Sequence, residues 1–136
     1  MPYADHSFDF VYARLVLHYL SNQDLTKSLQ ELFRILKPEG KIYVVVRSNE
    51  CKEATSPFAT YDAVSGFTTY PLANGMHLKR RFHSKESIQD FLLFAGFQIM
   101  HVETYEEQLC TDFQRKHLSK YLDSLIEVLA VKKGFL

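Results

Sequence analysis

The sequence predicts a layered α/β domain in which strands and helices alternate along the chain. Apolar runs rich in β-branched and aromatic residues mark four strands, at residues 8–17, 41–47, 98–105 and 125–132. Two segments with helical apolar spacing lie between them, after the capping serines Ser21 and Ser84. The order strand, helix, strand, insert, helix, strand, strand is typical of right-handed crossovers between parallel strands, with a last antiparallel strand.

The first strand begins at Phe8 and ends at Leu17, and its run of apolar residues indicates burial on both faces. Ser21 and Asp24 resemble a capping box, which predicts the start of the first helix. Its apolar face comprises Leu25, Leu29, Leu32, Phe33 and Leu36. We expect the sequence Lys-Pro-Glu-Gly at residues 37–40 to end this helix, because proline cannot continue it.

Residues 41–47 are the clearest buried strand, and an irregular insert occupies residues 48–82. Within it, Asn74-Gly75 is a strong turn signal, so we predict a β-hairpin over residues 66–82. Ser84 begins the second helix and Gly96 ends it. Residues 106–120 are polar and have no clear pattern.

The composition fits one globular domain over residues 1–136, and it excludes several classes of protein. Lys+Arg and Asp+Glu are both 16, so the net charge is zero and no broad attraction to nucleic acid or to a membrane surface is indicated. No apolar run reaches the roughly 18 residues of a membrane span. Cys51 and Cys110 lie far apart and predict neither a metal site nor a disulfide framework, so we expect a cytoplasmic protein.

Four segments of the sequence resemble one known family. They are residues 2–11 (PYADHSFDFV), 16–20 (VLHYL), 31–41 (ELFRILKPEGK) and 94–97 (FAGF). In the same order they resemble LPF-x-D-x-SFD-x-V, VLHHL, E-x-x-RVLKPGG-x and xAGF of class I S-adenosylmethionine-dependent methyltransferases that act on small molecules, the type 11-like group. The resemblance covers essentially the whole chain and implies a three-layer, Rossmann-like α/β sheet.

The chain departs from this family at the cofactor loop. The family begins with a strand and a glycine-rich loop, and an acidic residue after its second strand binds the ribose. Here the five glycines are widely spaced, the closest pair being nine residues apart, so neither feature can be placed. The resemblance therefore implies the C-terminal half of a methyltransferase, a partial sheet with the N-terminal half missing, and residues 48–82 as a variable insert.

From this resemblance we expect a truncated methyltransferase that is inactive as it stands. Without the loop, S-adenosylmethionine loses several contacts, and binding by this chain alone is expected to be weak or absent. Two alternatives stay open: a non-enzymatic dimeric interaction module, and half of a split methyltransferase whose loop comes from another chain.

The resemblance also suggests site residues, each with a plainer structural alternative. Ala13, Arg14 and Leu15 follow the first strand and would lie near the methionine part of the cofactor, or simply form a connection with a solvated Arg14. His18 matches a histidine that faces the cleft of the family, where it could act as a base, or it is a structural histidine.

The insert corresponds to the variable, substrate-contacting region of the family. Its candidate substrate-binding residues are Tyr61, Tyr70, His77 and Arg80. The basic run at residues 79–81 could meet an anionic substrate or form a solvated turn.

Finally, the resemblance places residues 8–17 beside a strand that this sequence does not contain. The run has no proline to protect a free edge, which predicts a homodimer through this strand.

Overall fold

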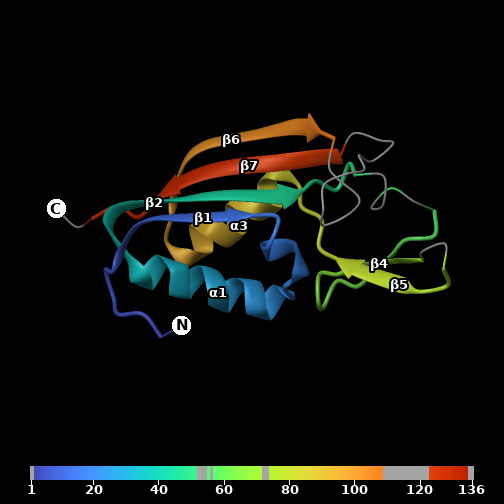
Figure 1. The fold of residues 1–136 in the computed structure, drawn as a ribbon, viewed down its shortest axis with the longest axis horizontal. Helices are drawn as coiled ribbons and strands as arrows, with labels where there is room; N and C mark the ends of the chain where they lie inside the picture. Colours follow the sequence, from blue (N-terminus) through green and yellow to red (C-terminus); the bar gives the residue numbers. More distant parts are fainter. Residues whose placement is uncertain (1, 52–54, 56, 72–73, 109–122, 135–136) are drawn as a thin grey trace.

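The computed structural model describes residues 2–51, 55, 57–71, 74–108 and 123–134, and it has the expected α/β fold (Figure 1). The main sheet has the order β1-β2-β7-β6. Its strands are β1 (Phe8–Arg14), β2 (Leu36–Arg47), β6 (Gln98–Glu107) and β7 (Asp123–Val131). β1 and β2 are parallel, and β7 is antiparallel to both of its neighbours, β2 and β6. The predicted element order and the final antiparallel strand are confirmed.

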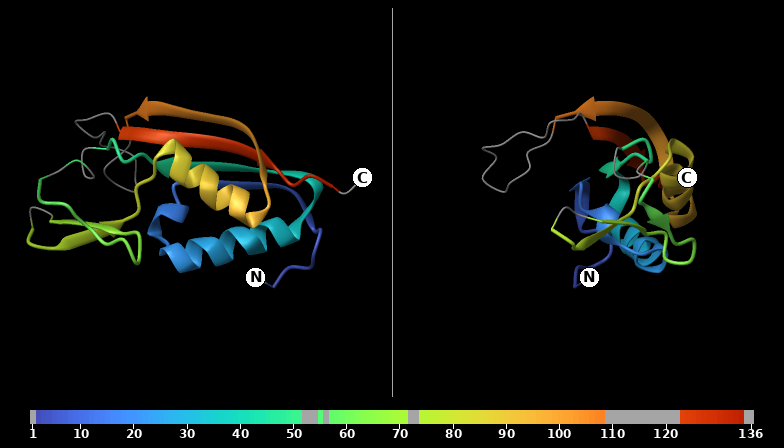
Figure 2. Two further views of the ribbon diagram at one scale, coloured as in Figure 1. Left: turned by 180° about the vertical axis from the view of Figure 1, so that it is seen from behind. Right: turned by 90° about the vertical axis from the view of Figure 1, so that its right-hand side faces the viewer.

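Both described α-helices lie on one face of this sheet. They are α1 (Asn22–Ile35) and α3 (Lys85–Ala95), which pack against each other and lie on the same side of the strands in the end-on view of Figure 2. The described part of the chain thus forms two layers, and the third layer that we expected is not built from it. The connection from β1 to β2 contains α1, and the connection from β2 to β6 contains α3. Both connections run in the same direction across the sheet, and because such connections are right-handed, both helices lie over the same face.

Ser21 and Ser84 both cap helices as predicted, although only one of the two capping-box hydrogen bonds forms at Ser21. The Ser21 side chain accepts a hydrogen bond from the N–H of Asp24, and Ser84 and Ser87 bond reciprocally in a capping box. Gly96 ends α3 with a φ of 111°, a left-handed conformation that favours glycine.

The junction between α1 and β2 differs from our expectation. The helix ends at Ile35 and the strand already begins at Leu36, not at Lys41. Leu36 is extended and lies opposite Phe8 of β1, and the proline two residues later favours an extended chain over a helical one. The Lys132 ammonium donates to the carbonyl oxygens of Phe33 (2.8 Å) and Leu36 (3.0 Å), which stabilises this helix end.

The insert contains a second, three-stranded sheet of order β3-β4-β5. β4 (Thr68–Pro71) and β5 (His77–Arg80) form the predicted hairpin, with Gly75 at a φ of 84° in the turn, and β3 (Thr60–Tyr61) adds to its edge. Figure 1 shows this small sheet beyond the carboxyl ends of β1 and β2. A one-turn helix η1 (Leu17–Tyr19) lies between β1 and α1.

The core lies between the main sheet and the two helices. Ile42, Val44 and Val46 of β2 point into it and pack with residues such as Leu29 and Leu92 of the helices. The alternate residues point to the opposite face, where Phe10 and Tyr12 are 51 % and 64 % exposed. We call this second face of the main sheet the open face. No described helix is both long enough and apolar enough to cross a lipid bilayer.

Candidate functional site

The carboxyl ends of β1 and β2 meet the insert through three backbone hydrogen bonds. The N–H of Arg81 donates to the carbonyl oxygen of His18 (2.8 Å), and the N–H of His83 donates to that of Arg47 (2.9 Å). The N–H of Asn49 in turn donates to the carbonyl oxygen of His83 (2.8 Å). These bonds fix the end of the insert against the strand ends, the place where doubly wound sheets bind ligands.

A cavity of about 390 Å³ opens between the insert and the first turns of α1 and α3. Its lining consists of Asn22, Asn49, Tyr61, Gly66, Thr68, Arg81, Phe82, Ser84, Ser87 and Phe91. The lining contains one cation and no carboxylate, so the cavity favours an anionic or polar ligand.

Arg81 is the cation of this cavity and is only 4 % exposed. Its guanidinium donates to the carbonyl oxygens of Leu20 (3.1 Å) and Ser65 (2.9 Å) and lies over the ring of Phe91. It packs directly on Gly66, whose missing side chain makes room for the guanidinium.

Five buried side-chain nitrogens have no hydrogen-bond partner in the described part of the chain. They are Nδ1 and Nε2 of His18, Nε of Arg47, Nε of Arg80 and Nε2 of His83. His18 lies in η1, Arg47 ends β2, Arg80 ends β5 and His83 lies just before α3. Because native proteins rarely leave buried polar atoms unpaired, a group of them at one place indicates a ligand site.

The two histidines are neutral at pH 7. Burial, together with the positive charges of Arg47 and Arg80, lowers the pKa of His18 to about 3. Burial also lowers the pKa of His83 to about 3, with Arg81 and His18 as further causes. A neutral imidazole can donate one hydrogen bond and accept another. Both nitrogens of His18 and Nε2 of His83 remain for a polar ligand, whereas His83 Nδ1 lies 2.7 Å from Ser87 Oγ.

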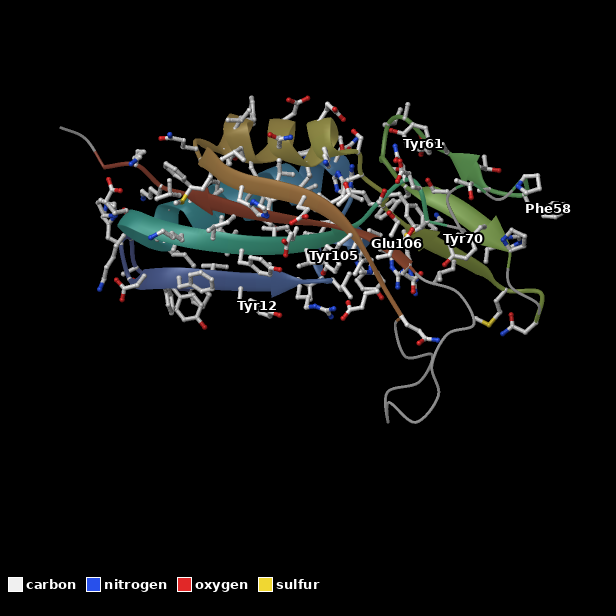
Figure 3. The ribbon with its side chains drawn as sticks, turned by 90° about the horizontal axis from the view of Figure 1, so that it is seen from above. Tyr12, Phe58, Tyr61, Tyr70, Tyr105 and Glu106 are labelled. Carbon is white, nitrogen blue, oxygen red and sulfur yellow. The ribbon has the colours of Figure 1, made fainter. Side chains whose placement is uncertain are left out.

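The structure brings together only part of the predicted substrate-binding set. Tyr61 lines the cavity, and Arg80 lies close enough to His18 to lower its pKa. Tyr70 is 7 % exposed in the small sheet, and His77 is exposed near the hairpin turn; neither lines the cavity. Figure 3 shows Tyr61 and Tyr70 at the small-sheet end of the molecule, with Tyr12 and Tyr105 along the main sheet.

Arg81 and His83 are the residues that our set of candidates missed. Both follow the hairpin, and both are buried, whereas the preceding Lys79 is exposed. Lys79 and Arg81 are two residues apart, so strand alternation alone would place them on the same face and gave no signal for the burial of Arg81.

Two of the three predicted cofactor-contacting residues, Arg14 and Leu15, make a polar contact within the chain. Ala13 is buried, Arg14 forms an ion pair with Glu107, and the N–H of Leu15 donates to the carbonyl oxygen of Val45 (2.9 Å). Leu15 also has a φ of 57°, which turns the chain sharply away from the strand direction.

The chain is similar to methyltransferases in sequence and in fold. A family model described as a methyltransferase domain matches residues 1–44. Phosphoethanolamine N-methyltransferase 1 of Zea mays is 32 % identical over 88 % of this chain, and an S-adenosylmethionine-dependent methyltransferase of Methanosarcina mazei superposes over 99 % of it with a TM-score of 0.80 at 17 % identity. The chain therefore has the fold of class I methyltransferases, and the Methanosarcina protein that it superposes on is an S-adenosylmethionine-dependent methyltransferase.

The chain spans only part of the proteins that it matches. It covers 21 % of the maize enzyme and 64 % of the Methanosarcina chain. A further similar structure is 1,6-didemethyltoxoflavin-N1-methyltransferase of Burkholderia thailandensis, which was solved with bound S-adenosylhomocysteine. The superposition covers 96 % of our chain and 46 % of that protein, with a TM-score of 0.56 at 16 % identity.

Proposed function

We propose that this chain forms the acceptor side of a site that transfers a methyl group from S-adenosylmethionine to a small molecule. The observation that carries the proposal is the group of buried, unpartnered nitrogens on His18, Arg47, Arg80 and His83. A polar acceptor entering beside them would supply the missing hydrogen-bond partners. The crevice at the strand ends is also where a sheet of this type binds its ligand.

An acceptor that bears a phosphate fits this site best. Three guanidinium groups, those of Arg47, Arg80 and Arg81, lie near the two histidines, and Asp123, 3.2 Å from Arg47, is the carboxylate paired with one of them. Arginine matches the geometry of phosphate oxygens. The maize relative is named for phosphoethanolamine, which carries a phosphate ester and an amine, so we take a phosphate-bearing amine as the acceptor class.

His18 is the side chain that we place next to the amine of the acceptor. An ammonium must lose its proton before the nitrogen can attack a methyl group, and a histidine can accept that proton. Burial and the charges of Arg47 and Arg80 make free His18 a weak base. A bound phosphate would offset the two charges and so raise the proton affinity of the imidazole when the acceptor is present.

On the cofactor side, we infer that this chain alone binds weakly and does not turn over. S-adenosylmethionine would supply the activated methyl group, but the polar groups of Arg14 and Leu15 bond within the chain and no glycine-rich loop can be placed. Calorimetric titration with S-adenosylhomocysteine should give a Kd weaker than about 10 μM, or −7 kcal/mol. Tighter saturable binding would contradict this inference.

Two alternatives predict different results in the same experiments. Half of a split methyltransferase would turn over only when a second chain with a glycine-rich loop is added. A non-enzymatic interaction module, which the exposed strand β1 favours, would dimerise and bind no acceptor.

The acceptor site is tested by titrating the chain with phosphoethanolamine. We expect R80Q to weaken binding at least tenfold, because Arg80 lies beside His18. K79Q is the matched control, since Lys79 is the neighbouring residue of the same strand and is exposed. Equal affinity of the two variants, or no binding by the unmodified chain, would show that the site is not an acceptor site.

A further inference from the structure

A cluster of one histidine and two glutamates lies on the open face, apart from the proposed acceptor site. His101 and Glu103 are two residues apart on β6, so both side chains point to the same side of the sheet. Glu127 lies on β7 directly opposite Glu103 in the antiparallel register. None of the three lines the cavity beside the insert.

The cluster brings one nitrogen and two carboxylate oxygens to a common point. His101 Nε2 lies 3.3 Å from Glu127 Oε1 and 3.5 Å from Glu103 Oε2, and all three groups offer atoms within 4.8 Å of one another. Zinc binds nitrogen and oxygen at about 2.0–2.1 Å, so ligands at tetrahedral corners are about 3.3 Å apart. Two of the three separations already have this value to within a few tenths of an ångström.

Two further features point to a cation between these groups. Like charges directly opposite each other on neighbouring strands destabilise a sheet, and Glu103 and Glu127 are such a pair. In addition, the hydroxyl of Tyr43 on β2 donates to the other oxygen of Glu127, Oε2, at 2.6 Å. This bond fixes the carboxylate with Oε1 toward His101, as outer hydrogen bonds do around metal ligands.

We propose that His101, Glu103 and Glu127 form a site for a first-row divalent transition metal ion that joins β6 to β7. The mixed set of imidazole and carboxylate suits zinc, cobalt or manganese, whereas calcium and magnesium prefer oxygen alone. Three protein ligands leave a fourth position for water or for a side chain of whatever covers the open face.

The proposal is tested by calorimetric titration of the chain with Zn²⁺ at pH 7.5, and with Co²⁺ followed by its absorption spectrum. We expect one equivalent to bind, and H101A and E103Q each to weaken binding at least tenfold. H77A and E106Q are the controls, because His77 is an exposed histidine of β5 and Glu106 an exposed glutamate of β6 on the opposite face. Both controls should bind like the unmodified chain.

If H77A weakens binding as much as H101A does, the metal binds to surface histidines adventitiously and the proposal is overturned. The absence of binding would also overturn it. Y43F supplies a second criterion, because Tyr43 touches only the outer oxygen of Glu127. We expect it to weaken binding several-fold without changing the stoichiometry. Unchanged affinity in Y43F, together with unchanged affinity in E103Q, would leave a simple pair between His101 and Glu127 and no metal site.

Discussion

The two buried histidines make the stability of the folded chain depend on pH. The pKa of His18 and of His83 is about 3 in the fold, against an ordinary value of 6.5. Above pH 6.5 the folded and unfolded states are both neutral at these rings. Between pH 6.5 and 3 only the unfolded state takes up their protons, so the free energy of unfolding falls as the pH falls, by up to about 1.4 kcal/mol per pH unit for each ring.

Urea denaturation at pH 7.5, 6.5 and 5.5 measures this dependence, in a range above the ordinary pKa values of carboxylates. Between pH 6.5 and 5.5, we expect the free energy of unfolding of H83Q to fall by about half as much as that of the unmodified chain. H77Q, which changes an exposed histidine, should keep all of it. The same slope in both variants would show that the buried rings are not its source.

Lys132 is a third residue whose burial matters, because its ammonium caps the end of α1. It donates to the carbonyl oxygens of Phe33 and Leu36 and lies 4.6 Å from the centre of the Phe33 ring. We expect K132M to lower the free energy of unfolding by about 2 kcal/mol, since hydrogen bonds to a charged group are lost and two carbonyls stay buried. The neighbouring Lys133 is exposed and lies 3.7 Å from Glu39, so K133M should change the free energy of unfolding by less than about 0.5 kcal/mol. Equal losses in thermal or urea unfolding would contradict the capping role.

At the scale of elements, two glycines of the insert have the same backbone conformation but different surroundings, so their substitution distinguishes the cost of backbone strain from the cost of side-chain packing. Gly66 and Gly75 have nearly the same φ, 83° and 84°. A Cβ at Gly75 would meet nothing within 4 Å, whereas one at Gly66 would collide with the Arg81 guanidinium and lie 2.5 Å from Asn22 Oδ1. Substitution by alanine therefore carries the same conformational cost at both sites and a steric cost at only one.

We expect G75A to lower the free energy of unfolding by about 1 kcal/mol and G66A by at least about 2 kcal/mol. G66A should also weaken phosphoethanolamine binding, because it displaces Arg81 from the cavity wall. Urea denaturation and titration measure the two effects. A G66A variant as stable as G75A would mean that the guanidinium moves aside freely and does not define the cavity.

Elements with a local signal could be predicted from the sequence. Ser21 and Ser84 begin the two helices through their own side chains, and Gly96 ends α3 through its conformation. Asn74-Gly75 lies in the turn between β4 and β5. The start of β2 at Leu36 could not be predicted, because it depends on pairing with Phe8, far away in the sequence.

The candidate site was predicted only in part for the same reason. His18 and Arg80 were found through the resemblance and the basic run, but the burial of Arg81 and His83 is decided by contacts with Leu20, Ser65 and Ser87. Tyr70 and His77 carry suitable chemistry, and only the register of the small sheet shows that they lie away from the cavity.

At the scale of the whole molecule, β1 is one edge of the described main sheet. The N–H of Leu15 donates to Val45 of β2, and backbone groups alternate in direction along a strand, so the N–H groups of Tyr12 and Arg14 point away from β2. The predicted homodimer would use this edge. A two-fold axis at Val11 pairs the strand antiparallel with its copy and sets Phe10 opposite Tyr12 twice, an aromatic pairing that stabilises neighbouring strands.

We therefore expect the chain to be a dimer in solution, with one continuous sheet formed through β1. Phe10 and Tyr12 are 51 % and 64 % exposed in the single chain, and an unprotected edge with exposed aromatic side chains invites a further strand. Y12P removes an outward-pointing N–H without breaking the pairing with β2, so it should shift the mass measured by light scattering toward the monomer value of 15.9 kDa. F94K is the control, because Phe94 is 72 % exposed on α3 and away from the edge, and it should remain dimeric. A monomer of the unmodified chain at about 50 μM, well above the micromolar Kd of an ordinary stable interface, would show that this edge is covered by something other than a second copy.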